Sequence, residues 1–384
     1  MTWTHRERIL AALNHEEPDR VPIDFGGAEF TSITLAAYEN LKKYMGVDDP
    51  TEVMSIIHTV AHPSETMLNR FDVDTRNVQP SPYEGGVDHW TDDNTYTDTF
   101  NVLWKRTEKA VDQHFLHQDG PFHDGKLTVE RVEEYDWPDG KNPGLVRGIK
   151  ERVEQIRANG DHAVCLYIPG GVIHRGYAMR GFESYLKDLY KRPEALQRMM
   201  DKLCDFWCDN ATSMIEAAGP ENVDIVYFGE DLGTQDSCMF DPETIYKEYL
   251  KPRHRRMVET VKGLTNNRAK VCFHCCGSAY HFIPHLLDIG IDALNPVQVT
   301  AKNMEPERLK EEFGDRLSFW GAINTQQTLP FGTPEEVVAE TKRIISILGK
   351  GGGYVLNSVH NIQAEVPPEN IVAMFETGVA HRYH

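Results

Sequence analysis

The sequence lacks any apolar run long enough to span a membrane. Its longest uninterrupted apolar stretches, such as residues 163–168, fall far short of the roughly 20 residues that a spanning helix needs. The first residues follow a charged pattern of helical period, with no apolar segment leading to a cleavage site. We therefore expect a cytoplasmic protein that has no membrane partner.

Positive charge is also scarce. The chain has 40 Lys and Arg residues against 59 Asp and Glu residues, which gives a formal net charge of −19. A nucleic-acid surface needs a clustered positive field, so this composition argues against a nucleic-acid partner. The negative charge suits docking to a basic face of another protein, and the sequence leaves a homodimer open.

Cysteine is rare, with seven residues in 384. The number is odd, and Cys165, Cys272, Cys275 and Cys276 lie in strand-like segments, whereas disulfide frameworks spread their cysteines over loops. This usage predicts reduced thiols.

The chain has no internal repeat, low-complexity tract or Ser/Gly linker, so we expect residues 1–384 to form one domain. What recurs is a short apolar, β-branched run, followed by a turn and an amphipathic helical stretch. The runs cover residues 20–25, 73–80, 162–169, 223–229, 269–275, 291–298, 317–324 and 352–360. Alternating units in this number predict the α/β class, as a (β/α)8 TIM barrel with an N-terminal helical extension.

Residues 81–140 interrupt this alternation. The stretch is polar and rich in aromatic residues, and its alternating pattern predicts antiparallel β-hairpins. We interpret it as an insertion that lies over one mouth of the barrel. The alternative is a surface hairpin with no ligand-binding role.

In a barrel of this kind, functional groups lie at the carboxyl ends of the strands. The fifth run ends in "AKVCFHCCGSAYHF", residues 269–282. Side chains of a strand alternate between its faces, so His274 and Cys276 point one way and Cys275 points the other. Cys272 shares the face of His274 but lies deeper in the barrel. The Cys-x-x-Cys redox interpretation is excluded, because that motif works at the N-terminus of a helix.

One imidazole and one thiolate suit an ion such as Zn²⁺, and a catalytic zinc site needs about three protein ligands. His360, at the end of the eighth run, is placed to be the third, and Glu230, at the end of the fourth, offers an oxygen ligand or a base. The alternative is that His274 and Cys276 are core residues beside a pocket. His281 and His285, one turn apart, form either a metal pair or an amphipathic helix face.

Other strand ends supply polar and aromatic candidates for a pocket. Glu230 and Asp231 are a ligand, a base or a substrate anchor, or else they cap the following helix. The predicted polar groups of the pocket are Asp231, Asn295, Gln298 and Asn324, and the predicted wall residues are Tyr227, Tyr167, Phe319 and Trp320. Each aromatic residue has a packing role as its alternative.

Three segments together resemble the uroporphyrinogen decarboxylase superfamily, and specifically its cobalamin-dependent methyltransferase branch. They are "RERILAALNHEEPDRVPIDFGG", "DIVYFGEDLGTQDSCMFDPETIYKEYLKPRHRRM", and the series from "FHCCGS" through "LSFWGAINTQQTLPFGTPEEV" to "NSVHNIQAEVPPENIVAMF". The resemblance implies a (β/α)8 barrel with zinc bound by a His-x-Cys motif and a later cysteine. Here His274 and Cys276 fill the motif, whereas His360 stands where thiol-methylating relatives have the cysteine. The Arg-rich substrate motif of the decarboxylase branch has no counterpart after "RVPIDFGG".

Each thiolate ligand weakens zinc as a Lewis acid, so an imidazole in its place favours polarising an ether oxygen. The resemblance therefore implies a zinc-dependent methyltransferase, an O-demethylase component. It would move a methyl group from a methyl ether, such as a methoxylated aromatic, to the Co(I) corrinoid (cobalamin) of a partner protein. Glu230 would be a fourth ligand or a proton donor to the leaving oxygen. The alternatives are methyl transfer from the corrinoid to a thiol, a decarboxylase, and a non-catalytic protein that only docks a corrinoid partner.

Overall fold

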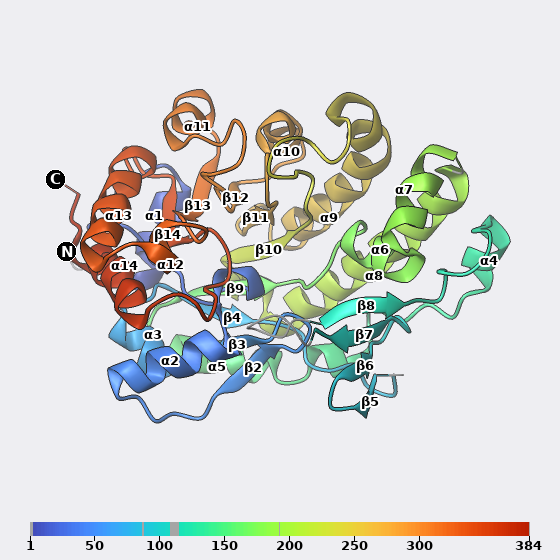
Figure 1. The fold of residues 1–384 in the computed structure, drawn as a ribbon, viewed down its shortest axis with the longest axis horizontal. Helices are drawn as coiled ribbons and strands as arrows, with labels where there is room; N and C mark the ends of the chain where they lie inside the picture. The colour runs from blue at the N-terminus through green and yellow to red at the C-terminus, as the bar shows by residue number, and fades with distance from the viewer. Residues whose placement is uncertain (1–2, 87, 108–114, 192, 384) are drawn as a thin grey trace.

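Parallel strands form the centre of the molecule. The computed structural model describes residues 3–86, 88–107, 115–191 and 193–383, and its central sheet has the order β14-β13-β12-β11-β10-β9-β4 (Figure 1). The strands are β4 (Thr75–Val78), β9 (Ala163–Tyr167), β10 (Ile225–Gly229), β11 (Lys270–His274), β12 (Ala293–Asn295), β13 (Ser318–Ile323) and β14 (Tyr354–Ser358). Most of their residues are buried, as expected for strands covered on both faces. All seven fall inside predicted runs.

The first predicted run closes the barrel as a single bridge. Ile23 pairs in parallel with Leu356 of β14, and its carbonyl accepts the backbone N–H of Asp74 at 2.8 Å, next to β4. Pro22 has no N–H, and the N–H of Ile23 binds the Asp74 carboxylate at 2.7 Å, so no longer ladder forms here. The predicted (β/α)8 barrel is confirmed, with this difference in its first strand.

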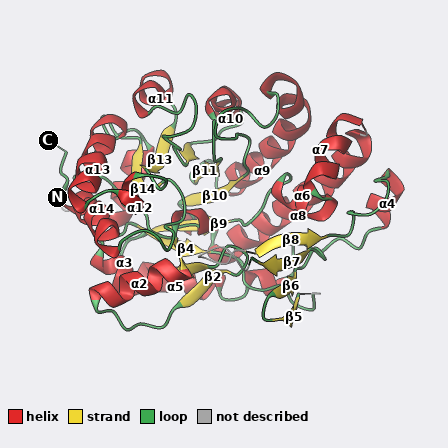
Figure 2. Cartoon of the chain, in the orientation of Figure 1, coloured by secondary structure: helices red, strands yellow, loops and turns green. Residues whose placement is uncertain are grey.

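Helices cover the outside of the sheet, as Figure 2 shows in red. After β4 they are α5 (Ile149–Ala158), α6 (His174–Arg180), α7 (Phe182–Lys191), α8 (Pro193–Ala218), the π-helix η4 (Pro242–Leu250), α9 (Lys251–Leu264), α10 (Ile283–Asp288), α11 (Pro306–Phe313), α12 (Thr328–Phe331), α13 (Pro334–Leu348) and α14 (Pro368–Ala380). Short 3-10 turns are η2 (Pro143–Val146), η3 (Pro220–Asn222) and η5 (Tyr280–Phe282). Among the described residues, none of the helices has the length and apolar character that a membrane crossing requires.

The N-terminal extension closes one end of the barrel. Ile9 and Leu13 of α1 (His5–Leu13) pack in the same buried interior cluster as Cys165 and Cys272. The segment that follows Ile23 contains η1 (Glu29–Thr31), β1 (Ile33–Thr34), α2 (Leu35–Met45), β2 (Glu52–Ser55), β3 (Val60–His62) and α3 (Glu65–Arg70). Strands β1, β3 and β2 form a small antiparallel sheet.

The predicted hairpin insertion is a four-stranded antiparallel sheet next to α6 (Figure 1). Its strands are β5 (His89–Asp92), β6 (Thr95–Thr97), β7 (Leu103–Arg106) and β8 (Phe115–Asp119), and α4 (Val129–Glu134) follows. The predicted hairpins are confirmed. That the whole chain is one domain stays a prediction.

Candidate metal centre and active site

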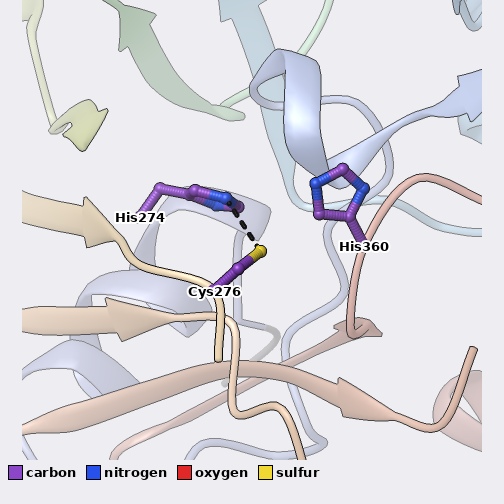
Figure 3. Close-up of side chains that lie close together, drawn as sticks. All are labelled: His274, Cys276 and His360. Atoms are coloured by element: carbon purple, nitrogen blue, oxygen red, sulfur yellow. Dashed lines mark hydrogen bonds between the residues drawn. The ribbon is translucent and has the colours of Figure 1, made fainter. Parts of the chain in front are cut away.

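Three predicted ligands meet at the carboxyl ends of the strands. His274 ends β11, Cys276 follows two residues later, and His360 follows the end of β14. Cys276 Sγ lies 3.3 Å from His274 Nε2, and each residue offers one ligand atom that lies within 4.8 Å of the other two (Figure 3). Nitrogen and sulfur atoms in this arrangement are a donor set that can hold a metal ion.

Asn295 and Tyr227 hold the His274 ring from behind. Asn295 Nδ2 donates to the carbonyl of Trp320 at 3.3 Å, which turns Asn295 Oδ1 toward His274 Nδ1 at 2.8 Å. The Tyr227 hydroxyl donates to Asn295 Oδ1 and lies 3.0 Å from His274 Nδ1. His274 Nδ1 therefore donates, and the lone pair of Nε2 is left for a metal ion. Both residues are fully buried and line neither cavity described below, so their contacts place them behind the His274 ring; that they bind substrate directly stays a prediction.

Burial keeps the two imidazoles neutral. Burial lowers the pKa of His274, and burial together with the neighbouring His274 lowers the pKa of His360 to about 3. Burial, Asp231 and Cys275 raise the pKa of the Cys276 thiol well above its ordinary range. Neutral imidazoles are ready to bind a metal, whereas the thiol must lose its proton when the metal binds.

Asp231 lies directly against the metal group. One carboxylate oxygen accepts the backbone N–H of Cys276 at 2.8 Å and lies 3.8 Å from His274 Nε2, and the other lies 3.5 Å from His174 Nε2. Burial alone would raise the pKa of Asp231, but His174 and His274 hold it well below its ordinary value. Asp231 in turn raises the pKa of His174 against the opposing effect of burial. The structure thus brings Asp231 to the site as a carboxylate.

Glu230 points to the opposite side of β10, away from the metal group. Its carboxylate accepts the backbone N–H groups of Val172, Ile173 and His174 at the start of α6, and His254 Nε2 lies 3.2 Å away. Strand alternation is the reason: Tyr227 and Asp231 face the barrel interior, so Glu230 faces the helices. The expected roles of Glu230 as ligand, base or proton donor are therefore not supported by its contacts.

A cavity of about 560 Å³ opens beside the metal group. Its walls combine aromatic rings with titratable groups from the barrel, from the segment around η1 and from β7 and β8 of the insertion. Lining residues include Glu29, Phe30, His58, Trp104, Phe115, His117, Tyr167, His174, Arg175, Tyr177, Asp231, His274 and His360. The cavity therefore places an aromatic wall and a candidate metal site around the same space.

Phe30 was not anticipated from the sequence, although it covers the ligands. Its ring stacks on His274 at 4.2 Å between ring centres, and it lies 5.4 Å from the ring of His360. Glu29 beside it accepts the Tyr167 hydroxyl at 2.7 Å and lies 2.5 Å from His58 Nδ1. Burial opposes ionisation of Glu29, but His58 lowers its pKa to about 2. The sequence offered no pattern that singles out Phe30, because η1 lies in an irregular segment that follows the apolar run of residues 20–25.

Gln298 and Asn324 line a smaller cavity of about 230 Å³ on the Cys276 and His360 side of the metal group. Gln298 Oε1 accepts the N–H of Gly277 at 2.7 Å, and Asn324 Oδ1 accepts the N–H groups of Gln326 and Gln327 at 2.8 and 3.0 Å. These two residues shape the loops next to the ligands.

The other aromatic and cysteine candidates divide between wall and core. Tyr167 lines the large cavity, whereas Trp320 is buried and donates to Asp24 at 2.9 Å, and Phe319 packs in the main core. Cys275 Sγ accepts the N–H of Leu232 at 3.4 Å, outside the metal group. His285 lies 3.1 Å from Glu243 Oε1, which is an ion-pair contact on a helix face.

The chain is a (β/α)8 barrel with a candidate His-Cys-His metal centre at the carboxyl ends of its strands. Residues 111–381 match the profile of the uroporphyrinogen decarboxylase (URO-D) family, which is more than half of the chain. The chain therefore belongs to this family.

Curated relatives are similar at low identity. The uroporphyrinogen decarboxylase of Psychromonas ingrahamii is 25% identical over 196 residues, 51% of each chain, and that of Methylococcus capsulatus is 26% identical over 241 residues, 61% of this chain and 62% of that protein. The chain thus spans about half the length of the first of these relatives. A solved methyltransferase from Methanosarcina mazei aligns with a TM-score of 0.64 at 16% identity, covering 98% of this chain and 99% of that one. This likeness shows a shared fold.

Proposed function

We propose that this protein is a zinc-dependent methyltransferase that moves a methyl group from an aromatic methyl ether to the Co(I) corrinoid of a partner protein. One observation carries the proposal: the ligand atoms of His274, Cys276 and His360 lie within 4.8 Å of one another beside a cavity with aromatic walls. The fold shared with the methyltransferase of Methanosarcina mazei supports it.

The residues present fit a zinc ion. Imidazole nitrogen and thiolate sulfur are the atoms that Zn²⁺ prefers, and three protein ligands leave a position open for substrate. The hydrogen bond from His274 Nδ1 to Asn295 directs Nε2 to the ion, and burial keeps both imidazoles neutral. Bound Zn²⁺ would supply a Lewis acid, made stronger by having one thiolate ligand instead of two.

The chain's own residues would orient the ether and protonate its product. Phe30, Tyr167 and Trp104 line the cavity and would hold a flat ring. Asp231 fixes the backbone of Cys276 and raises the pKa of His174, which also lines the cavity. His174 would then give a proton to the phenolate oxygen after the methyl group has left.

The test is methylation of free cob(I)alamin, followed by its absorbance spectrum, with purified zinc-loaded protein and a panel of methoxylated aromatics, methylamines and thiols. We expect methylation from ethers, lost in His274→Ala and kept in the exposed control His281→Ala. Consumption of methylcobalamin by thiols, with no reaction from ethers, would establish the thiol methyltransferase alternative instead.

A second candidate is decarboxylation, because the curated relatives are uroporphyrinogen decarboxylases. Among the described residues that line the cavity, Arg175 is the only Lys or Arg, so a substrate with many carboxylates would have few partners there. Release of CO₂ from a carboxylated tetrapyrrole by metal-free protein would favour this candidate.

A further inference from the structure

Arg175 of α6 supplies the large cavity with a cationic group that the proposed chemistry does not use. Its guanidinium lies 4.7 Å from the ring centre of Phe100 and 5.9 Å from that of Trp104. Nη1 donates to Asp98, whose other contacts are Trp104 Nε1 at 2.7 Å and the N–H groups of Phe100 and Val102 at 2.8 and 3.1 Å. These contacts fix the guanidinium against the insertion.

The guanidinium has hydrogen-bond donors to spare. Within the described part of the chain, Asp98 is its one hydrogen-bond partner, so no described residue uses the N–H groups of Nε and Nη2. The side chain is 19% exposed and lines the cavity. Two adjacent N–H groups of an arginine match the two oxygens of a carboxylate.

Tyr177 lies beyond Arg175 in the same helix and adds a hydroxyl donor. Its ring lies 5.6 Å from His174 and lines the cavity, and its hydroxyl makes no hydrogen bond to any residue that the structure describes. Burial, with Asp231 and Glu230, raises the pKa of this hydroxyl against the opposing effect of Arg175. The hydroxyl therefore keeps its proton at neutral pH and can donate it in a hydrogen bond.

The acidic groups of the cavity are already engaged elsewhere. Glu29 accepts the Tyr167 hydroxyl and contacts His58, and Asp231 contacts His174 and the backbone of Cys276. Neither has a direct contact with Arg175, so neither takes up its spare donors. Arg175 and Tyr177 both line this space, which has aromatic walls and no other Lys or Arg among the described lining residues.

We propose that Arg175 and Tyr177 form an anion-binding subsite that selects aromatic methyl ethers carrying a carboxylate. That the substrate is an ether rests on the proposed function, whereas the anion-binding subsite rests on the contacts and exposure of Arg175 and Tyr177. Because the same cavity reaches His274 and His360, a flat ring held by its carboxylate at Arg175 directs its other substituents toward the metal group.

The experiment is calorimetric binding of 4-hydroxybenzoate, 4-hydroxybenzamide and phenol to zinc-loaded protein, with no corrinoid present. Asp98 balances part of the charge of Arg175, so we expect the benzoate to bind about tenfold more tightly than the benzamide, the value of a charge-assisted hydrogen bond. Arg175→Met keeps an unbranched apolar side chain at this position and should abolish this preference, Arg175→Lys should keep part of it, and Tyr177→Phe should reduce it. Arg147→Met, a surface arginine paired with Glu84, is the matched control and should change nothing.

Equal affinity for benzoate and benzamide, or a preference that survives in Arg175→Met, would overturn the inference. Unchanged zinc content and unfolding temperature show that each variant is folded. Charge-selective binding without methylation of cob(I)alamin would leave the subsite standing and remove the proposed function. Methylation of cob(I)alamin from neutral and anionic ethers at equal KM would support the proposed function and overturn the anion-binding subsite.

Discussion

At the scale of residues, Asn295 shows how a strand-end amide can support a candidate site from behind a ligand residue. Its Nδ2 is held by the Trp320 carbonyl, and its Oδ1 therefore faces His274 Nδ1 at 2.8 Å. Asn295 would thus act on a bound metal ion through the orientation of His274. The sequence analysis predicted Asn295 as a pocket residue, because its place at a strand end indicates where the residue lies. That place does not reveal which groups its side chain contacts.

Replacing Asn295 by Leu should weaken zinc binding without removing it. The ring of His274 loses its acceptor, and such partners of a ligating histidine are worth about 10- to 100-fold in metal affinity. Competition with a chelator measures the change, and Asn40→Leu, at an exposed position of α2 far along the chain from the ligands, is the matched control. Equal affinities in Asn295→Leu and wild type would show that the hydrogen bond does not orient the ligand.

Replacing His360 by Ala should lower bound zinc well below one ion per chain. The remaining His274 and Cys276 are two ligands, fewer than the three of catalytic zinc sites. Metal analysis by mass spectrometry measures the stoichiometry, with the exposed His281→Ala as control. Full zinc content in His360→Ala would remove His360 from the ligand set.

At the scale of elements, β10 separates the two acidic residues that follow it. Asp231 reaches the metal group, whereas Glu230 crosses to the start of α6 and binds three backbone N–H groups there. Gly171 makes this approach possible, because a Cβ there would lie 2.2 Å from the carboxyl carbon of Glu230. The strand thereby joins the site to the helix that carries His174 and Arg175.

Replacing Glu230 by Gln should destabilise the fold and leave the metal group intact. One oxygen becomes an NH₂ group that faces backbone N–H donors, so we expect the free energy of unfolding to fall by about 2–3 kcal/mol. Denaturant unfolding measures this change, and zinc content should stay the same. Glu183→Gln, which breaks an exposed pair with Lys187, is the control and should leave the free energy of unfolding almost unchanged. Loss of zinc in Glu230→Gln with unchanged stability would restore Glu230 as a ligand.

At the scale of the whole molecule, several buried titratable groups share one direction of pH dependence. Burial, Arg76 and His5 lower the pKa of His162 to about 4, and burial and His274 lower that of His360 to about 3. Below pH 6.5 the unfolded chain protonates both histidines, whereas the native protein resists until about pH 4 and pH 3. Glu29, with a pKa of about 2, adds stability that is lost as the pH falls below 4.5. All three effects weaken the native state on acidification.

The metal-free protein should therefore unfold at a lower temperature at pH 4.5 than at pH 7. Differential scanning calorimetry across this range measures the fall, and His162→Gln, which removes one buried titrating group, should make it smaller. An unfolding temperature that stays constant or rises between pH 7 and 4.5 would contradict the assigned directions.

The eight β-strand and helix units and the convergence of His274, Cys276 and His360 could be predicted from the amino-acid pattern. Periodicity and strand alternation are local rules, and the barrel brings all its strand ends to one face. The surroundings of these three residues became clear from the folded chain: Phe30 stacks on His274, Asn295 and Tyr227 lie behind it, and Glu230 points to the helices. Such contacts join residues from different elements, and their geometry depends on side-chain packing that no local pattern encodes.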